Sequence, residues 1–161
     1  MAGARFDGTA AIEHLSGLVD AINDPSPLLA ELGEYGLRST RARFKTQTAP
    51  DGTAWAGLET WYKREKSRNK NRILTLDGYL RSRMTWQFAG DRTVEIGSNL
   101  PYAAVHQFGA TIKPRAAKVL MFRGHVANSV TIPARPYLGL SDEDRSEIVG
   151  RTLEWLQRIM K

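Results

Sequence analysis

Two hydrophobic periods follow one another along this chain, and their order constrains the fold more than any other feature. Near both ends, apolar residues recur every three or four positions, as on one face of a helix. Between the ends, apolar and polar residues alternate over short runs, as in half-buried strands. This order predicts an α+β fold with N-terminal helices, a central antiparallel β-sheet of short strands, and a C-terminal helix.

The helical segments show apolar stripes and boundary signals. The first two stripes, separated by "NDPSP", are Ile12, Leu15, Leu18, Val19 and Ile22, then Leu28, Leu32, Tyr35, Ser39 and Ala42. Gly33 and Gly36 either weaken the second helix or allow another element to pack closely against it. Ser141 and Asp144 approximate a capping box for the last helix. We predict that this helix buries Val149, Leu153, Leu156 and Met160.

The middle of the chain is predicted to be rich in strands. Met84, Trp86 and Phe88 alternate with polar residues before the turn "AGDR", so this region is predicted to form a hairpin. The segments "ATIKP", "KVLMFR" and "SVTIP" predict further short strands. The chain is read as a single domain, 1–161, since this length suffices for one core. Its parts are N-terminal helices (1–46), a Trp-containing turn and basic loop (47–75), a β-rich core (76–140) and the C-terminal helix (141–161).

Composition excludes several classes of protein. Hydrophobic residues make up 42% of the chain and charged residues 25%, which argues against wholesale disorder. The chain has no cysteine, which excludes disulfides, thiolate catalysis and cysteine-ligated metals. No stretch approaches the roughly 20 apolar residues of a membrane span, and the N-terminus lacks the apolar run of a signal peptide. We expect a soluble protein made in the cytoplasm.

Positive charge is concentrated in one segment. Residues 63–83 contain eight basic and two acidic residues, a net +6, whereas the rest of the chain has 15 of each. Such a cluster suits a phosphate or an acidic partner surface, although a solvated loop has the same composition. The loop residues that we expect to contact a partner are Lys63, Arg64, Lys66, Arg68, Lys70 and Arg72.

No catalytic motif is found. The histidines His14, His106 and His125 do not form a metal-binding pair on a helix, and H-E-x-x-H, G-x-S-x-G, P-loop and G-x-G-x-x-G patterns are missing. His106, in "YAAVHQFG", has the right chemistry for a general base but no nucleophile in its motif. We therefore expect His106 and Gln107 to hydrogen-bond backbone or a neighbouring chain while Tyr102, Val105 and Phe108 pack. The sequence predicts no catalytic, cofactor-binding or metal-binding residue.

Several phrases in fixed order resemble a known family. They are "PDGTAW", "LDGYLRSRM", "VEIGSNLPYAAVHQFGATI" and "IPARPYLGLSDEDRSEI", and the likeness extends from about Tyr35 to Ile148. This pattern resembles the phage virion morphogenesis family, the tail completion proteins of contractile-tailed phages of the Mu and P2 type. The pair "YAAVHQFG" and "ARPYLGLS" is the most specific part of the resemblance.

The resemblance implies a structural virion protein with no enzymatic residue and no cofactor. It implies a fold similar to small tail-terminator and neck subunits, which assemble as rings, commonly hexamers. The residues it carries over are structural or interface positions: Tyr102, His106, Gln107 and Gly109 in one motif, and Arg135, Pro136 and Leu138 in the other.

Elementary backbone chemistry agrees with this transfer. Gly109 can adopt the positive φ that ends a short helix. Pro136 restricts Arg135 to an extended backbone, which directs the guanidinium of Arg135 toward a bidentate partner. We expect Arg135 to brace the junction between the last strand and the last helix.

Partners follow from the same resemblance. We expect a homo-oligomer, commonly a hexameric ring, that contacts the tail tube or sheath and the head–tail connector, with transient contact with DNA in the channel left open. No membrane contact is expected; the protein is expected in the tail or neck of the virion after assembly in the host cytoplasm. Tail termination and head–tail joining both fit, as do phage, prophage and tail-like particle origins.

An alternative from another class is a nucleic-acid-binding module. Its basic cluster would bind phosphates and nearby aromatic rings would stack on bases. Those rings belong to Trp55, Trp61, Tyr62, Tyr79 and Trp86.

Overall fold

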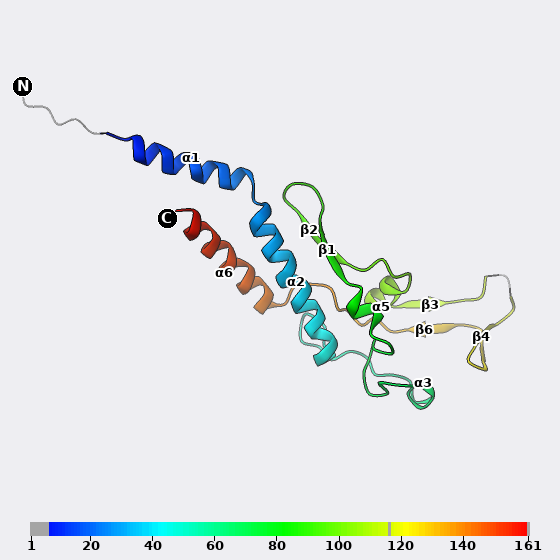
Figure 1. The fold of residues 1–161 in the computed structure, drawn as a ribbon. Helices are drawn as coiled ribbons and strands as arrows, with labels where there is room; N and C mark the ends of the chain where they lie inside the picture. The colour runs from blue at the N-terminus through cyan, green and yellow to red at the C-terminus, as the bar shows by residue number, and fades with distance from the viewer. Residues whose placement is uncertain (1–6, 116, 161) are drawn as a thin grey trace, which may run out of the picture.

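The computed structural model describes residues 7–115 and 117–160. Within these residues, three long helices, α1 (Thr9–Asn23), α2 (Ser26–Thr46) and α6 (Asp142–Ile159), form one half of an elongated molecule (Figure 1). The other half holds the short helices and most of the strands, beyond the C-terminal end of α2. The predicted α+β class is confirmed.

Short antiparallel strands form separate ladders and not one central sheet. Three two-stranded sheets are found in the described residues. They are β1 (Thr85–Phe88) with β2 (Val94–Gly97), β3 (Ala110–Ile112) with β6 (Val130–Ile132), and β4 (Leu120–Phe122) with β5 (His125–Ala127). Because a two-stranded ladder is at best marginally stable in water, each depends on packing against other elements.

Three short helices lie in the segments between α2 and β3. They are α3 (Thr60–Glu65), α4 (Tyr79–Ser82) and α5 (Ala103–Phe108). The segment "LTLDGYLRSR" contains α4, and "YAAVHQFG" contains α5. The sequence did not predict α3, which includes the start of the basic segment.

The core lies where the C-terminal half of α2 meets the turn segments. Phe44, Met84 and Tyr137 are each no more than 1% exposed. The ring of Phe44 lies 5.4 Å from the rings of both Trp55 and Tyr137, centroid to centroid. Aromatic pairs at this separation contribute about 0.5–1.5 kcal/mol beyond their buried area. One side chain of α2 therefore holds together segments that lie far apart in the sequence.

Two glycines in α2 let the first hairpin approach the helix. A Cβ at Gly33 would lie 2.6 Å from Cδ2 of Trp86, and a Cβ at Gly36 would collide with Cδ1 of Ile96. Trp86 is on β1 and Ile96 on β2, and these two residues are cross-strand partners. The close packing that the sequence allowed at Gly33 and Gly36 is thus present.

The buried face of α2 differs from the predicted stripe. Leu28 is buried as expected, but Ala42 is exposed, and the residues facing the apolar core are Leu37 and Phe44. Tyr35 and Ser39 instead donate hydrogen bonds to Asp144 on α6. The helix has two covered faces, one apolar and one polar. The predicted stripe contains residues of both faces, with Leu28 buried and with Tyr35 and Ser39 on the polar side.

Candidate functional site

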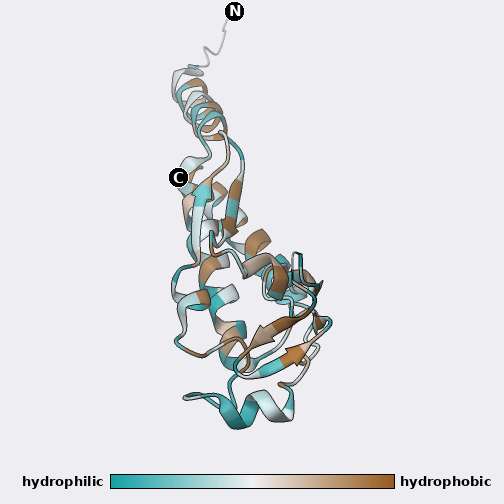
Figure 2. Ribbon diagram, turned by 90° about the vertical axis from the view of Figure 1, so that its right-hand side faces the viewer, coloured by the Kyte–Doolittle hydropathy of each residue, from teal (hydrophilic) through white to brown (hydrophobic). Residues whose placement is uncertain are grey.

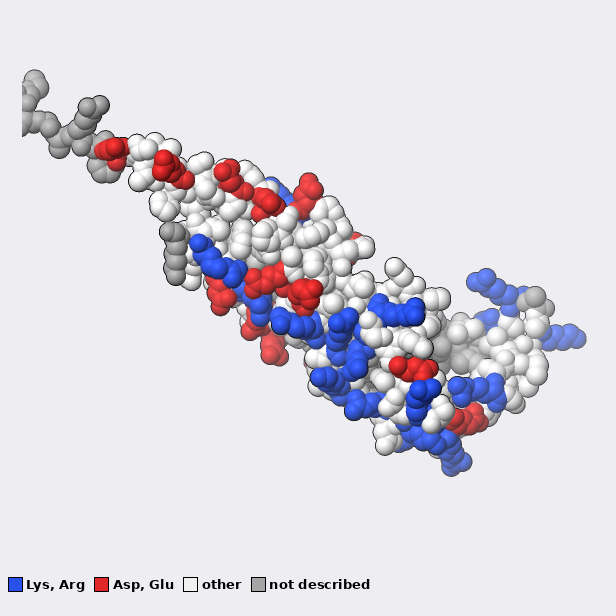
Figure 3. Space-filling model, viewed as in Figure 1, with Lys and Arg blue, Asp and Glu red and all other residues white. Residues whose placement is uncertain are grey.

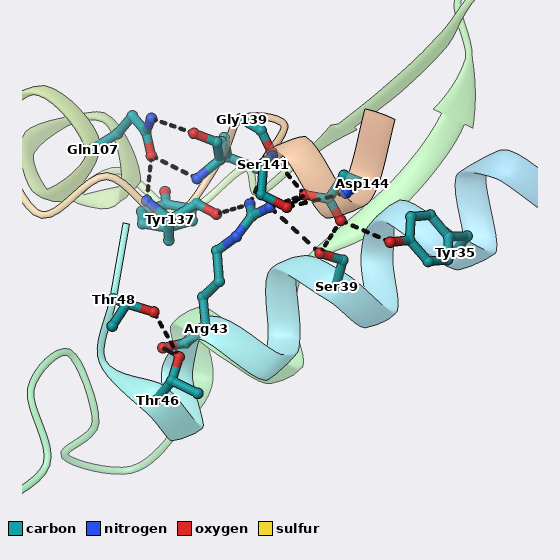
Figure 4. Close-up of polar contacts among 11 residues, drawn as sticks. Tyr35, Ser39, Arg43, Thr46, Thr48, Gln107, Tyr137, Gly139, Ser141 and Asp144 are labelled. Carbon is teal, nitrogen blue, oxygen red and sulfur yellow. Dashed lines mark hydrogen bonds and ion pairs between the residues drawn. The ribbon is translucent and has the colours of Figure 1, made fainter. Parts of the chain in front are cut away.

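The side chain of Gln107 joins the two motifs "YAAVHQFG" and "ARPYLGLS". Its Nε2 donates to the carbonyl of Leu138 at 3.0 Å, and its Oε1 accepts from the backbone N–H groups of Tyr137 and Leu138, both at 3.0 Å (Figure 4). One amide thus satisfies three backbone groups of the extended segment after Pro136. Gln107 fixes this segment on α5 and leaves the ring of Tyr137 in the core.

Arg135 fastens the same segment to the tryptophan turn. Its Nε and Nη2 donate to the carbonyls of Ala56 and Gly57, at 2.7 and 2.8 Å, and only 6% of the residue is exposed. Burial lowers the pKa of this guanidinium. The neighbouring carbonyl of Pro136 accepts from Nε1 of Trp55 at 2.7 Å. Arg135 has the expected forked partner, the two carbonyls of the Trp55 turn, and it thereby anchors the connection between β6 and α6 on that turn.

His106 lies inside this framework. Its carbonyl accepts from the backbone N–H of Arg135 at 2.8 Å, and its ring meets the edge of Tyr102 at 5.9 Å. Within the described residues, Nδ1 of His106 is buried and has no hydrogen-bond partner. Burial, and secondarily the charge of Arg135, lower the pKa of His106, so its ring is neutral near pH 7. Among residues 7–115 and 117–160, no hydroxyl group is hydrogen-bonded to Nδ1 of this ring.

The C-terminal end of α5 combines a glycine of positive φ with an exposed aromatic side chain. Gly109 has a φ of 74°, and a Cβ there would lie 2.8 Å from the backbone nitrogen of Ala134. Only glycine fits this chain reversal without strain. Phe108, predicted to pack, is 77% exposed, because the buried side of the short helix is occupied by Ala103. Tyr102 is 40% exposed, and its ring packs against that of His106.

A buried ion pair that the sequence did not reveal joins α2 to α6. Arg43 donates from Nη2 to Asp144, and from Nη1 to the carbonyls of Tyr137 and Gly139 at 2.9 and 2.8 Å (Figure 4). Arg43 and Asp144 are 7% and 2% exposed. The capping box of Ser141 and Asp144 was recognised from sequence and is present. Asp144 is also the counter-ion of Arg43, which lies 101 residues earlier in the sequence. This pair forms only because α2 and α6 pack together.

The ionisation of Asp144 is set by its donors. Burial alone would raise the pKa of Asp144, but hydrogen bonds from Ser39, Ser141 and Tyr35 outweigh it and lower the pKa to about 2. Conversely, burial and the hydrogen bond to Asp144 raise the pKa of Tyr35 to about 12. The carboxylate is therefore charged, and the phenol neutral, throughout the physiological range.

The basic loop is an ordered structure built around one lysine. Lys66 is 2% exposed, and its Nζ donates to the carbonyls of Asn69, Arg72 and Thr75, at 2.5 to 2.7 Å. The prediction that Lys66 contacts a partner with the other cations is wrong, because its ammonium closes the loop from inside. The other predicted contact residues are exposed: Lys63, Arg64, Arg68, Lys70 and Arg72.

The aromatic residues proposed to stack on bases are mostly occupied. Trp55 is in the core at 5% exposure, and Nε1 of Trp86 donates to Glu34 at 2.8 Å while its ring covers Gly33. Trp61 packs on Phe122 and His125 of the β4–β5 hairpin, at centroid distances of 5.8 and 4.5 Å. Tyr79 is 55% exposed, but the guanidinium of Arg83 lies over its ring, 5.4 Å from the ring centroid.

The outer faces of α1 and α6 are apolar and exposed. Four residues of the α1 stripe are 54 to 68% exposed, while Leu18 is half-buried. On α6 and the residue that follows it, three apolar residues are 54 to 58% exposed. These residues are Ile12, Leu15, Val19 and Ile22, and Val149, Leu153 and Met160. The predicted burial is wrong for Val149, Leu153 and Met160, whereas Leu156 is half-buried. The side chains that α6 turns fully inward are Asp144 and Trp155. Figure 2 shows hydrophobic positions along α1, which extends away from the body of the molecule.

The described part of the chain holds neither a cluster of metal ligands nor a helix suited to a membrane. There, no three His, Asp or Glu side chains gather closely enough to hold a metal ion. Nor does any helix in it have the length and apolar character needed to span a bilayer.

These features define a class: a small α+β subunit whose buried polar groups hold backbone segments together and whose outer helix faces lack a cover. The chain belongs to the phage virion morphogenesis family, whose pattern matches residues 6–157. The family resemblance inferred from the motifs is thereby confirmed. No solved structure matches the chain significantly.

Individual relatives come from phages and a prophage. The chain is 36% identical to "Putative capsid assembly protein G" of Escherichia phage Mu, over 70% of this chain and 67% of the relative. It is 29% identical to "Tail completion protein S" of Escherichia phage P2, over 91% of this chain and 95% of the relative. It is also 29% identical to "Mu-like prophage FluMu G protein 2" of Haemophilus influenzae, over 95% and 91%. These relatives support a structural or morphogenetic role in phage assembly.

Proposed function

We propose that this protein is a non-catalytic virion subunit that completes the phage tail, or fastens it to the head, as an oligomeric ring on the end of the tail tube. The relatives from phage P2 and phage Mu, named as tail completion and capsid assembly proteins, support a role in assembly of the phage particle. The observation that carries the proposal is the pair of exposed apolar stripes on α1 and α6.

Such stripes need a cover in the working protein. Burying apolar surface is worth about 25 cal/mol per Å², so uncovered helix faces favour association. Contiguous exposed apolar surface commonly marks a contact with another protein. The two-stranded ladders offer further contacts, because their outer backbone edges can pair with a neighbouring strand. A ring arises when one such contact between unlike surfaces repeats by rotation until it closes.

A structural role also accounts for the polar residues of the motifs. Gln107 and Arg135 are each hydrogen-bonded to backbone carbonyls or N–H groups of the same chain, and His106 is enclosed beside them. Side chains used in this way position chain segments, which is a structural use. Tyr102 and Phe108, exposed at the rim of α5, are candidates for subunit contact.

The basic loop serves as the contact with a different protein in this proposal. Its exposed lysines and arginines would meet an acidic face of the tail tube or connector, and the buried Lys66 keeps the loop in one shape. Tight binding of phosphates would hinder DNA that must slide through a virion channel, so a protein surface is the preferred partner. Retarded migration of DNA in a gel, weakening steeply with salt, would favour the nucleic acid instead.

The test is electron microscopy of particles assembled without this protein. Headless tails of uncontrolled length are expected if the protein terminates the tail. Complete tails beside full, unattached heads are expected if it joins them. Particles that mature normally would overturn the proposal. Complementation by His106→Ala, provided that the variant folds, should restore assembly; catalytic turnover lost with the imidazole would contradict the non-catalytic role.

A further inference from the structure

Positive and negative charges occupy different parts of this molecule. Residues 35–140 contain 18 cationic and six acidic side chains, a net +12, whereas the remaining residues contain five and eleven, a net −6. Figure 3 shows acidic side chains along α1 and basic side chains gathered from the C-terminal half of α2 toward α3. A subunit polarised in this way attracts a second copy end to end and resists pairing of like ends.

The positive region contains a pocket that the basic loop does not form. Arg38, Arg41 and Lys45 of α2, with Arg81 of α4, line an open pocket of ≈ 560 Å³. In residues 7–115 and 117–160, none of these four side chains takes part in an ion pair. Nη2 of Arg41 donates to the carbonyl of Met84 at 2.9 Å, which fixes its direction. Several cations around one hollow repel each other unless anions enter it.

Helix α1 has the complementary chemistry. It contains Glu13 and Asp20 and no lysine or arginine, and these carboxylates border its exposed apolar stripe. Glu13 and Asp20 are seven positions apart, as are Arg38 and Lys45. At 1.5 Å per residue, both separations correspond to about 10.5 Å along a helix. Two helices packed side by side could therefore form both charge pairs at once.

We propose that α1 of one copy docks along the basic pocket of a second copy, with Glu13 and Asp20 facing Arg38 and Lys45. This proposal rests on the ring-forming role proposed above and specifies the contact between neighbouring copies in the ring. Within one subunit, α1 leads away from the C-terminal end of α2, so it does not reach its own pocket (Figure 1). The contact joins two unlike surfaces, which is the kind that repeats by rotation.

The remaining surfaces of the pocket suit a helix. Ala42, exposed between Arg38 and Lys45, leaves room for close approach of a second backbone. The aliphatic stems of the arginines and lysine cover apolar side chains while their charged ends reach the bordering carboxylates. The stripe of α1 is thereby covered without a dedicated apolar groove.

The experiment measures self-association of the whole chain by sedimentation equilibrium. Arg38→Glu with Lys45→Glu, and separately Glu13→Lys with Asp20→Lys, should each weaken association about tenfold or more, since two attractive pairs become repulsive. Combining all four changes should bring the dissociation constant back to within about threefold of the wild type. Lys63→Glu with Arg72→Glu makes the same change in charge in the basic loop and should alter association less than about threefold.

Several results would overturn the contact. A wild-type chain that stays at its monomer mass of 18.0 kDa at every concentration would do so. So would a combined variant that fails to recover, or a loop variant as damaging as the pocket variant. Loss of DNA binding in the pocket variant, with unchanged association, would assign the pocket to phosphates. An oligomer without this charge dependence refutes the contact alone, whereas normal particles assembled without the protein refute the proposed function.

Discussion

The body around Tyr137 and the helical end formed by α1 and α6 use side chains in opposite ways. In the body, Arg43, Gln107 and Arg135 each make two or more hydrogen bonds to backbone groups of distant segments. At the helical end, apolar side chains that would ordinarily fill a core are more than half exposed. The body is held together by contacts within one chain, whereas in the proposed assembly the helical end is covered by a partner. Substitutions in the two regions should therefore affect different measurements.

The largest loss of stability is expected from Arg43→Ala. It removes the partner of a buried carboxylate and two donors to the carbonyls of Tyr137 and Gly139. Breaking a buried ion pair from one side costs about 3–5 kcal/mol. Urea unfolding should report this as a fall in the free energy of unfolding.

Arg38→Ala is the matched control for this change, because Arg38 is an exposed arginine on the same helix. Its effect should stay within about 0.5 kcal/mol. Equal effects at the two positions would show that the Arg43 network does not hold α2 to α6.

The second largest effect is a loss of stability at acidic pH, which depends on Asp144. The pKa of Asp144 falls from 3.8 to about 2 on folding, so its contribution to stability is complete above the unfolded value. That contribution, about 2 kcal/mol, should disappear as the pH falls from roughly 4 to 2. Unfolding measured across this range should show a steeper loss for the wild type than for Asp144→Asn. Parallel curves for the two proteins would contradict the assignment.

A pair of glycine substitutions should give effects of opposite sign. Gly33→Ala places a methyl against the ring of Trp86 and should cost about 1–3 kcal/mol. Gly17→Ala in α1 meets open space and should stabilise the chain by about 0.5–1 kcal/mol through helix propensity. Thermal unfolding of both variants tests whether the β1–β2 hairpin lies on α2 as described. A stabilising Gly33→Ala would contradict that packing.

The smallest effect on stability is expected at the helical end. Leu153 is 54% exposed, so Leu153→Ser should change the free energy of unfolding by less than about 0.5 kcal/mol. Leu37→Ala in the core should cost about 2–5 kcal/mol. A large loss for Leu153→Ser would mean that the α6 stripe is packed inside the subunit.

The sequence predicted the classes of structure well and the orientation of helices poorly. The capping box at Ser141 and the freedom required at Gly109 follow from local backbone chemistry, so they were recognisable without tertiary contacts. The β1–β2 hairpin was also recognisable, because apolar and polar residues alternate along its strands. In contrast, a stripe on α6 looks the same whether it faces a core of the same chain or another protein. Only the packed structure shows Val149 and Leu153 outside and Trp155 inside.

The polar contacts were harder still. Lys66 lies in a run of exposed cations, and nothing in its neighbours distinguishes the one whose ammonium enters the loop. Arg43 likewise sits among the cations expected at a helix C-terminus. Its partner Asp144 is 101 residues away, and no local pattern joins them. Long-range pairing of this kind depends on how helices pack, which single-sequence periodicity does not encode.

The most direct test of the account is assembly by a variant whose α1 stripe carries Ile12→Ser, Leu15→Ser and Val19→Ser. We predict that this protein folds with nearly unchanged stability but fails to restore completed particles where the wild-type chain is missing. Counting complete and defective particles by electron microscopy reads the outcome. Full restoration by the folded variant would contradict the claim that the exposed face of α1 is an assembly surface.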